Sequence, residues 1–291
     1  MKRIIALLLC LAALAASNAG AQSPAQSATT EKLRSSPQRH EWIEIALGSR
    51  RLKAMLITPQ TKPAGPVVLV LHEVFGLTDS TLATADEIAA MGYITLAPDM
   101  LSGFAPDGGG TSGFASTRLA GDFMTLLPDA TVNATLNAWS DYAATLPGSN
   151  GKTAVVGLSW GGGAAFRYAA SGVHRAGLQA VYVFYDVGPP AVTQGPDKFK
   201  PDAAPLSVDR IDVPVHGFYP ERDTRVMASL RKTRDAMAAA GKRFDVVIYP
   251  GAEHAYLRVG AAPDDANPAN AAAIKASYAR LQALLAAPDQ S

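Results

Sequence analysis

The feature that most constrains the fold is an apolar stretch that runs into Gly157-Leu158-Ser159-Trp160-Gly161. Residues 153–156 have the β-branched character of a buried strand, and the small residues that follow the motif are suited to a helix. A strand that turns directly into a helix strains the residue at the bend, and flanking glycines remove side chains that would collide. The pattern predicts a nucleophile elbow that exposes Ser159 at the start of a helix. The alternative is a glycine-rich turn whose serine only caps the helix.

The N-terminus has the pattern of a secretory signal peptide. Two basic residues precede an apolar run from Ile4 to Ala16, and Ala19-Gly20-Ala21 offers a cleavage site of small residues. The run of about 13 residues is shorter than the roughly 20 that span a bilayer. We therefore predict a signal peptide over 1–21, a flexible leader over 22–39 and a periplasmic or secreted protein. No membrane segment is expected after signal removal.

Removal of this segment would leave a nearly neutral chain without cysteine. The formal net charge falls from +1 to −1 with the loss of Lys2 and Arg3, and the single cysteine, Cys10, lies within the apolar run. A chain without a Lys/Arg run is not expected to have nucleic acid as its main partner. The mature chain would also lack disulfides, thiolate metal sites and a thiol nucleophile.

The rest of the chain alternates between short apolar runs and helical patterns. Strands are predicted at 42–46, 52–57, 67–71, 93–96, 153–156, 180–185, 213–218 and 244–249. Helices are predicted at 80–91, 129–146, 160–170, 223–241 and from 267 onward. This alternation indicates a mostly parallel central sheet flanked by helices, within a single α/β domain over 40–291. Such sheets place functional loops at the carboxyl ends of their strands.

A serine hydroxyl becomes a good nucleophile only beside a base, which in turn needs an orienting acid. Of the five histidines, His254 lies in the loop directly after the last predicted strand. Asp223 follows the preceding strand, and the chain order Ser159, Asp223, His254 is that of α/β-hydrolases. We therefore expect His254 to be the base and Asp223 the acid. Asp223 also suits a helix N-cap, and Glu221 or Asp186 would be alternative acids.

An attacked carbonyl becomes an oxyanion that needs two hydrogen-bond donors. The N–H of Trp160, directly after the nucleophile, is one expected donor. The N–H of Val74, in the loop after the predicted strand 67–71, is the other. Because both donors belong to the backbone, side-chain substitution would not remove them.

With these elements in place, residues of roughly 42 to 286 resemble the dienelactone hydrolase (carboxymethylenebutenolidase-like) family. The motifs that carry the likeness are Glu73-x-Phe75-Gly76, Gly92 to Asp99, Gly157-x-Ser159-x-Gly161-Gly162, Asp223 and Gly251-x-x-His254. The resemblance implies an α/β-hydrolase fold that cleaves esters or lactones. It also departs from the family, whose usual nucleophile is cysteine.

The resemblance implies two further site residues. The family's glutamate contacts the resting nucleophile, which places Glu73 in the site, unless it is a solvated loop carboxylate. Arg258 matches one of two arginines that hold a substrate carboxylate in dienelactone enzymes. The position of the other is Gly103 in this sequence. With Ser159 in place of cysteine, we expect His254 to carry more of the activation and the specificity to differ from strict dienelactone hydrolysis.

The sequence therefore predicts an exported serine hydrolase that cleaves a small or medium ester or lactone through an acyl-enzyme. No metal and no organic cofactor are expected. One alternative is a hydrolase of polyesters or bulky aromatic esters. The other is a non-catalytic binding protein that retains the α/β-hydrolase fold. The sequence makes no prediction of the oligomeric state.

Overall fold

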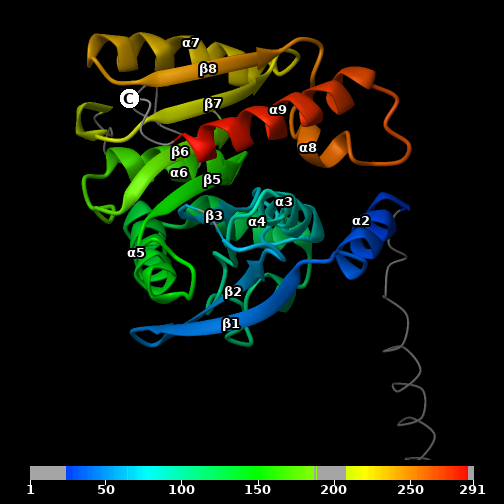
Figure 1. The fold of residues 1–291 in the computed structure, drawn as a ribbon, viewed down its shortest axis with the longest axis vertical. Helices are drawn as coiled ribbons and strands as arrows, with labels where there is room; N and C mark the ends of the chain where they lie inside the picture. Colours follow the sequence, from blue (N-terminus) through cyan, green and yellow to red (C-terminus); the bar gives the residue numbers. More distant parts are fainter. Residues whose placement is uncertain (1–23, 64, 187, 189–207, 288–291) are drawn as a thin grey trace, which may run out of the picture.

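The computed structural model describes residues 24–63, 65–186, 188 and 208–287, so the predicted signal peptide lies outside the described residues. The described residues form one sheet in the order β1-β2-β4-β3-β5-β6-β7-β8 (Figure 1). Its strands are β1 (Arg39–Leu47), β2 (Arg50–Thr58), β3 (Val67–Leu71), β4 (Thr95–Pro98), β5 (Thr153–Leu158), β6 (Leu178–Phe184), β7 (Val215–Pro220) and β8 (Phe244–Tyr249). From β4 to β8 in this order all neighbours run parallel, while β2 is antiparallel to both β1 and β4.

Helices cover both faces of this sheet. One face packs against α4 (Thr117–Leu126), α5 (Asp129–Thr145), α6 (Trp160–Ala170) and α7 (Thr224–Ala239). The other packs against α3 (Asp79–Ala90), α8 (Tyr256–Val259) and α9 (Pro268–Ala286). Two short 3₁₀ helices, η1 (Thr111–Gly113) and η2 (Val208–Arg210), lie in connections. The predicted α/β-hydrolase architecture, a mostly parallel sheet between two helical layers, is confirmed.

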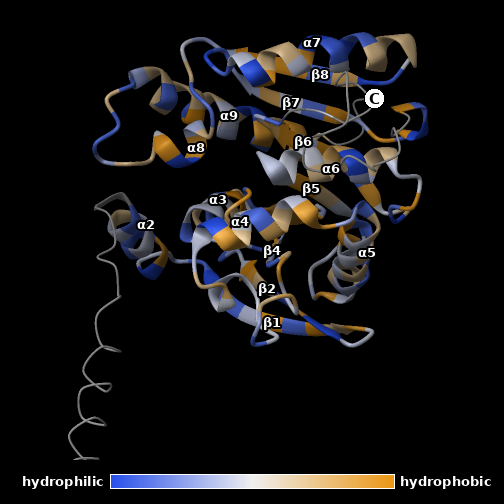
Figure 2. Ribbon diagram, turned by 180° about the vertical axis from the view of Figure 1, so that it is seen from behind, coloured by the Kyte–Doolittle hydropathy of each residue, from blue (hydrophilic) through white to orange (hydrophobic). Residues whose placement is uncertain are grey.

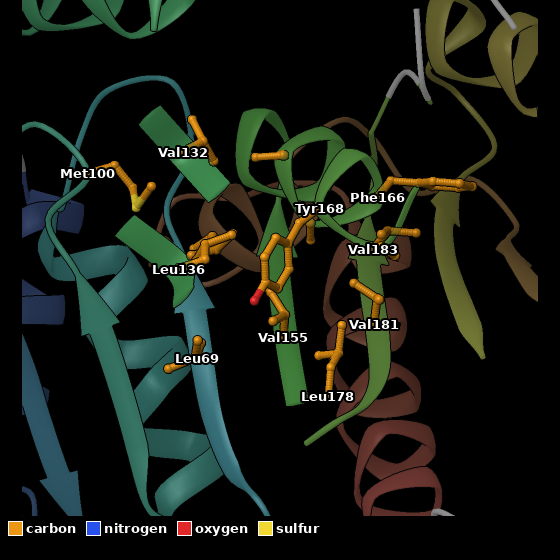
Figure 3. Packing of buried hydrophobic residues seen from close by; sticks show 14 of the residues in the cluster. Leu69, Met100, Val132, Leu136, Val155, Phe166, Tyr168, Leu178, Val181 and Val183 are labelled. Carbon is orange, nitrogen blue, oxygen red and sulfur yellow. The ribbon is translucent and has the colours of Figure 1, made fainter. Parts of the chain in front are cut away.

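The centre of the sheet shows why an unbroken apolar run becomes a strand here. Alternate residues of a strand point to opposite faces. Leu69 and Leu71 of β3 accordingly join the cluster beneath α5 and α6, whereas Val68 and Val70 join the cluster beneath α3 and α9. Figure 3 shows part of the first cluster, to which Leu69 of β3 and Leu136 of α5 both belong. A strand buried on both faces needs apolar residues at every position.

The edge strand β1 has a different pattern from the centre of the sheet. Its residues alternate between exposed and half-buried, and Figure 2 shows hydrophilic and hydrophobic residues alternating along it. Such alternation indicates a strand with one face toward the core and one toward solvent. Within the described residues, no helix has the length and apolarity needed to cross a bilayer.

The flexible leader expected over 22–39 is wrong for most of its length, because helix α2 (Pro24–Arg34) lies there and β1 already begins at Arg39. The helix packs beside α3 and is held by polar contacts that a hydrophobic pattern cannot reveal. The Thr30 hydroxyl donates to Asp79, and Lys32 pairs with Glu87. The sequence analysis also does not predict α4 or α8. Helix α8 has only four residues and is too short to show a period.

Candidate active site

The bend between β5 and α6 has the strained geometry that the glycine motif requires. Ser159 has φ of +51° and ψ of −109°, a backbone conformation that few residues with side chains adopt. A Cβ atom on Gly157 would lie 2.2 Å from the carbonyl oxygen of Gly161, and one on Gly161 would lie 2.5 Å from that of Leu71. Both glycines are therefore required by the close approach of strand and helix.

Three side chains from separate loops meet at this bend. Ser159 Oγ lies 3.1 Å from His254 Nε2, and His254 Nδ1 lies 2.6 Å from Asp223 Oδ2. His254 follows β8, and Asp223 caps the N-terminus of α7 by accepting a hydrogen bond from the Val226 N–H (3.0 Å). Asp223 thus caps the helix and also lies in the position expected of the acid beside the histidine.

The electrostatics of Asp223 favour its ionised form. Burial opposes ionisation, but hydrogen bonds from His254 and the Val226 N–H outweigh it and hold the pKa of the Asp223 carboxyl below its usual value. The alternative acids have other partners. Glu221 accepts from the Gly251 N–H (2.8 Å). Asp186 is buried, which raises its pKa, and it accepts from the Tyr219 hydroxyl and the Gly188 N–H.

A buried histidine, His72, adjoins the two residues that are expected to supply the oxyanion donors. Trp160 is the first residue of α6, and Val74 follows β3. Within the described part of the chain, the Val74 N–H has no hydrogen-bond partner. The ring of His72 stacks on that of Trp160, with centroids 6.0 Å apart. His72 therefore contacts one donor residue directly and is two positions from the other.

The hydrogen bonds of His72 define its tautomer and orient the loop. Its Nε2 accepts from the Met100 N–H (3.2 Å), so Nδ1 carries the proton and donates to the Glu73 carbonyl oxygen (2.7 Å). Burial lowers the pKa of His72 and thereby favours this neutral form. In a trans peptide the C=O and N–H point in opposite directions, so fixing the Glu73 carbonyl also fixes the Val74 N–H.

A second set of contacts, made by Asp99 and Thr111, holds the loop after β3. Asp99 accepts from both the N–H and the hydroxyl of Thr111 (2.7 Å each), and the Thr111 hydroxyl accepts from the Leu77 N–H (2.9 Å). Thr111 leaves no room for a side chain at Gly76, where a Cβ would lie 2.4 Å from its Oγ1 and φ is +82°. The loop after β3 is therefore rigidly supported.

Glu73 and Arg258, the two residues implied by the resemblance, form an ion pair with each other. Arg258 Nε donates to Glu73 Oε2 (2.8 Å), and its guanidinium lies over the Phe75 ring at 5.6 Å. The described hydrogen bond of the Ser159 hydroxyl is to His254 and not to Glu73. The other carboxylate oxygen of Glu73, Oε1, is buried without a hydrogen-bond partner among the described residues.

Gly103 packs against an arginine that comes from β2. A Cβ on Gly103 would lie 3.3 Å from Cγ of Arg50. The Arg50 guanidinium donates to the Ser102 carbonyl oxygen (2.9 Å from Nη2) and lies over the Phe104 ring at 4.0 Å. These contacts hold Arg50 against the chain, where it supports the loop after β4.

Tyr185 is a site residue that the sequence does not single out. It follows β6 with φ of +43°, and its ring meets that of His254 edge-on, with centroids 5.3 Å apart. The hydroxyl is buried and has no partner among the described residues. Burial and the nearby Glu73 charge raise the pKa of Tyr185 well above its usual value, so the hydroxyl remains a donor. Its position just after a parallel strand is the one signal that the sequence offers.

In the part of the chain that the structure describes, no group of three or more His, Cys, Asp or Glu side chains is arranged to hold a metal ion. The polar groups at the bend contact one another. These contacts form two sets, one around Ser159 and one around Glu73.

Comparisons with known proteins identify the family of this chain. The model of the dienelactone hydrolase family matches residues 52–287. A presumed carboxymethylenebutenolidase of Yersinia pestis is 29% identical over 192 residues, which are 66% of this chain and 68% of that protein. Carboxymethylenebutenolidase 1 of Cupriavidus pinatubonensis is 34% identical over 123 residues, which are 41% of this chain and 51% of that protein.

Solved structures share the fold at low sequence identity. A presumed dienelactone hydrolase of Klebsiella pneumoniae has a TM-score of 0.70 and 22% identity, with 86% of this chain and 98% of that chain covered. An esterase of Pyrobaculum calidifontis has a TM-score of 0.63 and 16% identity, with 90% of each chain covered. The family match extends over most of the sheet and all the site loops described above. The chain therefore belongs to the dienelactone hydrolase family and is a carboxylic ester hydrolase.

Proposed function

We propose that this protein is an exported serine hydrolase that cleaves carboxylic esters or lactones through an acyl-enzyme intermediate. The observation that carries the proposal is the hydrogen-bonded series from Ser159 through His254 to Asp223 at a strained strand-to-helix bend. A serine, a histidine and a carboxylate in this arrangement are the groups that acyl transfer requires.

In the proposed reaction His254 Nε2 takes the proton of the Ser159 hydroxyl as Oγ attacks the substrate carbonyl. The Asp223 carboxylate keeps the proton of the imidazole on Nδ1 and stabilises the imidazolium that forms. His254 then gives its proton to the leaving alcohol oxygen, and the acyl group stays on Ser159. Water activated by the same imidazole releases the acid and restores the serine.

The N–H groups of Val74 and Trp160 are the proposed donors to the oxyanion. Losing one such donor typically reduces the rate by about 10²–10³. The loop contacts of His72 and Thr111 support the proposal because they hold Val74 in one orientation before substrate arrives. A donor that is already oriented needs no reorganisation during the reaction.

Glu73 and Arg258 are proposed to contact the substrate next to the scissile bond. In this ion pair the guanidinium is partly exposed, and the second carboxylate oxygen of Glu73 is buried without a partner in the described part of the chain. Because Arg258 already has a carboxylate partner, a carboxylate on the substrate would have to compete with Glu73 for it. This supports a neutral ester or lactone as substrate more than the anionic dienelactone.

Substitution of Ser159 tests the proposed mechanism. Ser159→Ala is expected to abolish hydrolysis of p-nitrophenyl acetate and labelling by a fluorophosphonate probe, while the circular dichroism spectrum is unchanged. Ser149→Ala, in the surface turn before β5 and thus at the opposite end of this strand from Ser159, is the matched control and should retain both activities. Labelling of the Ser159→Ala variant at the wild-type rate would refute the nucleophile. Failure of the wild-type protein to react with any serine-directed probe would favour a non-catalytic binding protein.

Export is a separate part of the proposal and rests on the N-terminal sequence. The mature protein is expected to begin at Gln22 and to be found outside the cytoplasm. N-terminal sequencing of the protein from fractionated cells measures both. A chain that starts at Met1 or Lys2 in the cytoplasmic fraction would exclude export without affecting the proposed chemistry.

A further inference from the structure

The N-terminal helix α2 lies outside the region matched by the family model and yet borders the site. It packs beside α3 on the side of the molecule where α8 and the connection to α9 lie (Figures 1 and 2). Hydrogen bonds and an ion pair from Thr30, Lys32 and Ser36 to carboxylates of α3 hold it there. It is thus a docked element of the fold and has a defined face toward its neighbours.

A groove of about 870 Å³ separates α2 from α8. Gln26 and Thr29 of α2 line one wall, and Ala262, after α8, lines the opposite wall. Phe75 and Arg258 also line the groove. These two residues adjoin the active site, because Phe75 follows the proposed donor Val74 and Arg258 is bonded to Glu73. The groove is therefore continuous with the loop that would face the scissile bond.

The charges that line the groove are mostly negative. Asp79, Asp264 and Asp265 contribute carboxylates, whereas Arg258 is the one basic residue among the described lining. The positive charge of Arg258 is already balanced by the carboxylate of Glu73 in their ion pair. A group that extends along this groove therefore meets a negative potential, which disfavours an anion and tolerates a neutral or cationic group.

We propose that α2 forms the outer wall of a substrate subsite that receives a neutral or cationic group extending from the scissile ester past Phe75 and Arg258. This inference rests on the proposed esterase function. It assigns a binding site to the part of the substrate that lies beyond Ser159, His254 and Asp223. The subsite exists only because the N-terminal segment folds back on α3. The helix therefore contributes to substrate selection although it contributes no reacting group.

Filling the groove tests this subsite. Thr29→Trp narrows it from α2, and Ala262→Trp narrows it from the opposite wall. Ser27→Trp adds the same bulk at an exposed position of α2 that does not line the groove. The measurement is kcat/KM for p-nitrophenyl esters of increasing acyl length, and for acetates of alcohols of increasing length. One of the two series identifies which part of the substrate occupies the groove.

Both groove variants are expected to lower the ratio of kcat/KM for the long ester to that for the short ester by about tenfold or more, since a pocket discriminates by 10- to 200-fold for small changes in fit. Ser27→Trp should leave the ratio unchanged. An unchanged ratio in both groove variants, in both series, would overturn the subsite. If Thr29→Trp unfolds, as seen by circular dichroism, Ala262→Trp decides. Absence of any ester hydrolysis by the wild type would instead refute the proposed function.

The charge of the preferred group is tested with three p-nitrophenyl esters of equal length. Their acyl chains end in a methyl, a trimethylammonium or a carboxylate group. We expect the carboxylate ester to have the lowest kcat/KM, and Asp264→Asn to narrow its disadvantage several-fold. A preference of the wild type for the carboxylate ester would overturn this part of the inference and would show that Arg258 binds substrate carboxylates.

Discussion

The two halves of the site differ in how completely their polar atoms are bonded. On one side, both ring nitrogens of His254 and both carboxylate oxygens of Asp223 have partners. On the other side, Glu73 Oε1 and the Tyr185 hydroxyl are buried without a partner among the described residues. Each such atom typically costs about 1–3 kcal/mol of stability. The named groups of the first half are all hydrogen-bonded, whereas the second half has hydrogen-bonding capacity that the described residues do not use.

This difference separates two kinds of requirement. Proton transfer needs fixed distances, so the groups around Ser159 are held by the chain itself. Substrate recognition needs donors and acceptors that the chain does not already use, and we propose that Glu73 and Tyr185, each with one such atom among the described residues, provide them. We therefore expect substitutions in the first half to act mainly on kcat, and those in the second half to act on KM and on stability.

The largest effect is expected from Asp223→Asn. The amide presents a donor where His254 Nδ1–H needs an acceptor, so the ring takes the wrong tautomer; the corresponding change in a serine protease reduces kcat by about 10⁴. We expect kcat for p-nitrophenyl acetate to fall by about 10³–10⁴ with little change in KM. Glu221→Gln is the control and should stay within a few-fold of wild type. A large loss for Glu221→Gln and a small one for Asp223→Asn would reverse the assignment of the acid.

The contrast between the halves also explains what the sequence could and could not predict. The strand ranges 67–71 and 244–249 agree with β3 and β8, because short runs rich in apolar and β-branched residues report burial directly. The meeting of Ser159, His254 and Asp223 follows from chain order and the parallel sheet. The structure does place these three side chains within hydrogen-bond distance.

What the sequence could not predict depends on contacts between polar residues far apart in the chain. Helix α2 is held by Thr30 and Lys32, which contact carboxylates of α3 that lie 49 and 55 residues away in the sequence. The sequence presents these residues as a polar leader. Likewise, the orphaned hydroxyl of Tyr185 is visible only once its surroundings are known. Apolar periodicity carries no information on either.

A smaller effect is expected from His72→Gln, which tests whether the loop after β3 is set before substrate binds. Without the Nδ1–H bond to the Glu73 carbonyl, the Val74 N–H is no longer held in one direction. Complete loss of such a donor lowers kcat by about 10²–10³, so a misdirected donor should lower it by less. We expect kcat to fall by about 10- to 100-fold. KM should change little, and affinity for a trifluoromethyl ketone, which forms a tetrahedral adduct, should fall in parallel with kcat. Loss of stability with unchanged kcat would mean a purely structural role.

The same variant should change how stability depends on pH. Because burial lowers the pKa of His72 in the folded protein, the unfolded chain binds the proton more readily once the pH falls below about 6.5. Acidification from pH 7 to pH 5 therefore lowers the free energy of unfolding through this group, by up to about 1.4 kcal/mol per pH unit. The slope, measured by urea unfolding, should be shallower in His72→Gln. An equal slope would show that His72 binds its proton as well in the folded state.

The smallest effects come from a matched pair of tyrosines that sharpen the comparison between the two halves. Tyr185 and Tyr219 are both fully buried, but of their two hydroxyls only that of Tyr219 has a partner among the described residues, the buried carboxylate of Asp186. Removing an unpartnered buried hydroxyl should leave stability equal or raise it by up to about 1 kcal/mol, whereas removing a bond to a carboxylate should cost about 1.5–3 kcal/mol. Urea unfolding of Tyr185→Phe and Tyr219→Phe measures both changes.

The KM of Tyr185→Phe then shows whether the Tyr185 hydroxyl binds substrate or is only buried without a function. If substrate bonds to the Tyr185 hydroxyl, Tyr185→Phe raises KM several-fold while the folded protein is no less stable, since a hydrogen bond contributes about 0.5–1.5 kcal/mol. A stabilised variant with unchanged KM would show instead that the hydroxyl is a cost of placing a large ring against His254. Of the residues around Glu73, only Glu73 and Arg258 would then remain as proposed substrate contacts, and the groove beside α2 would have to supply the remaining selectivity.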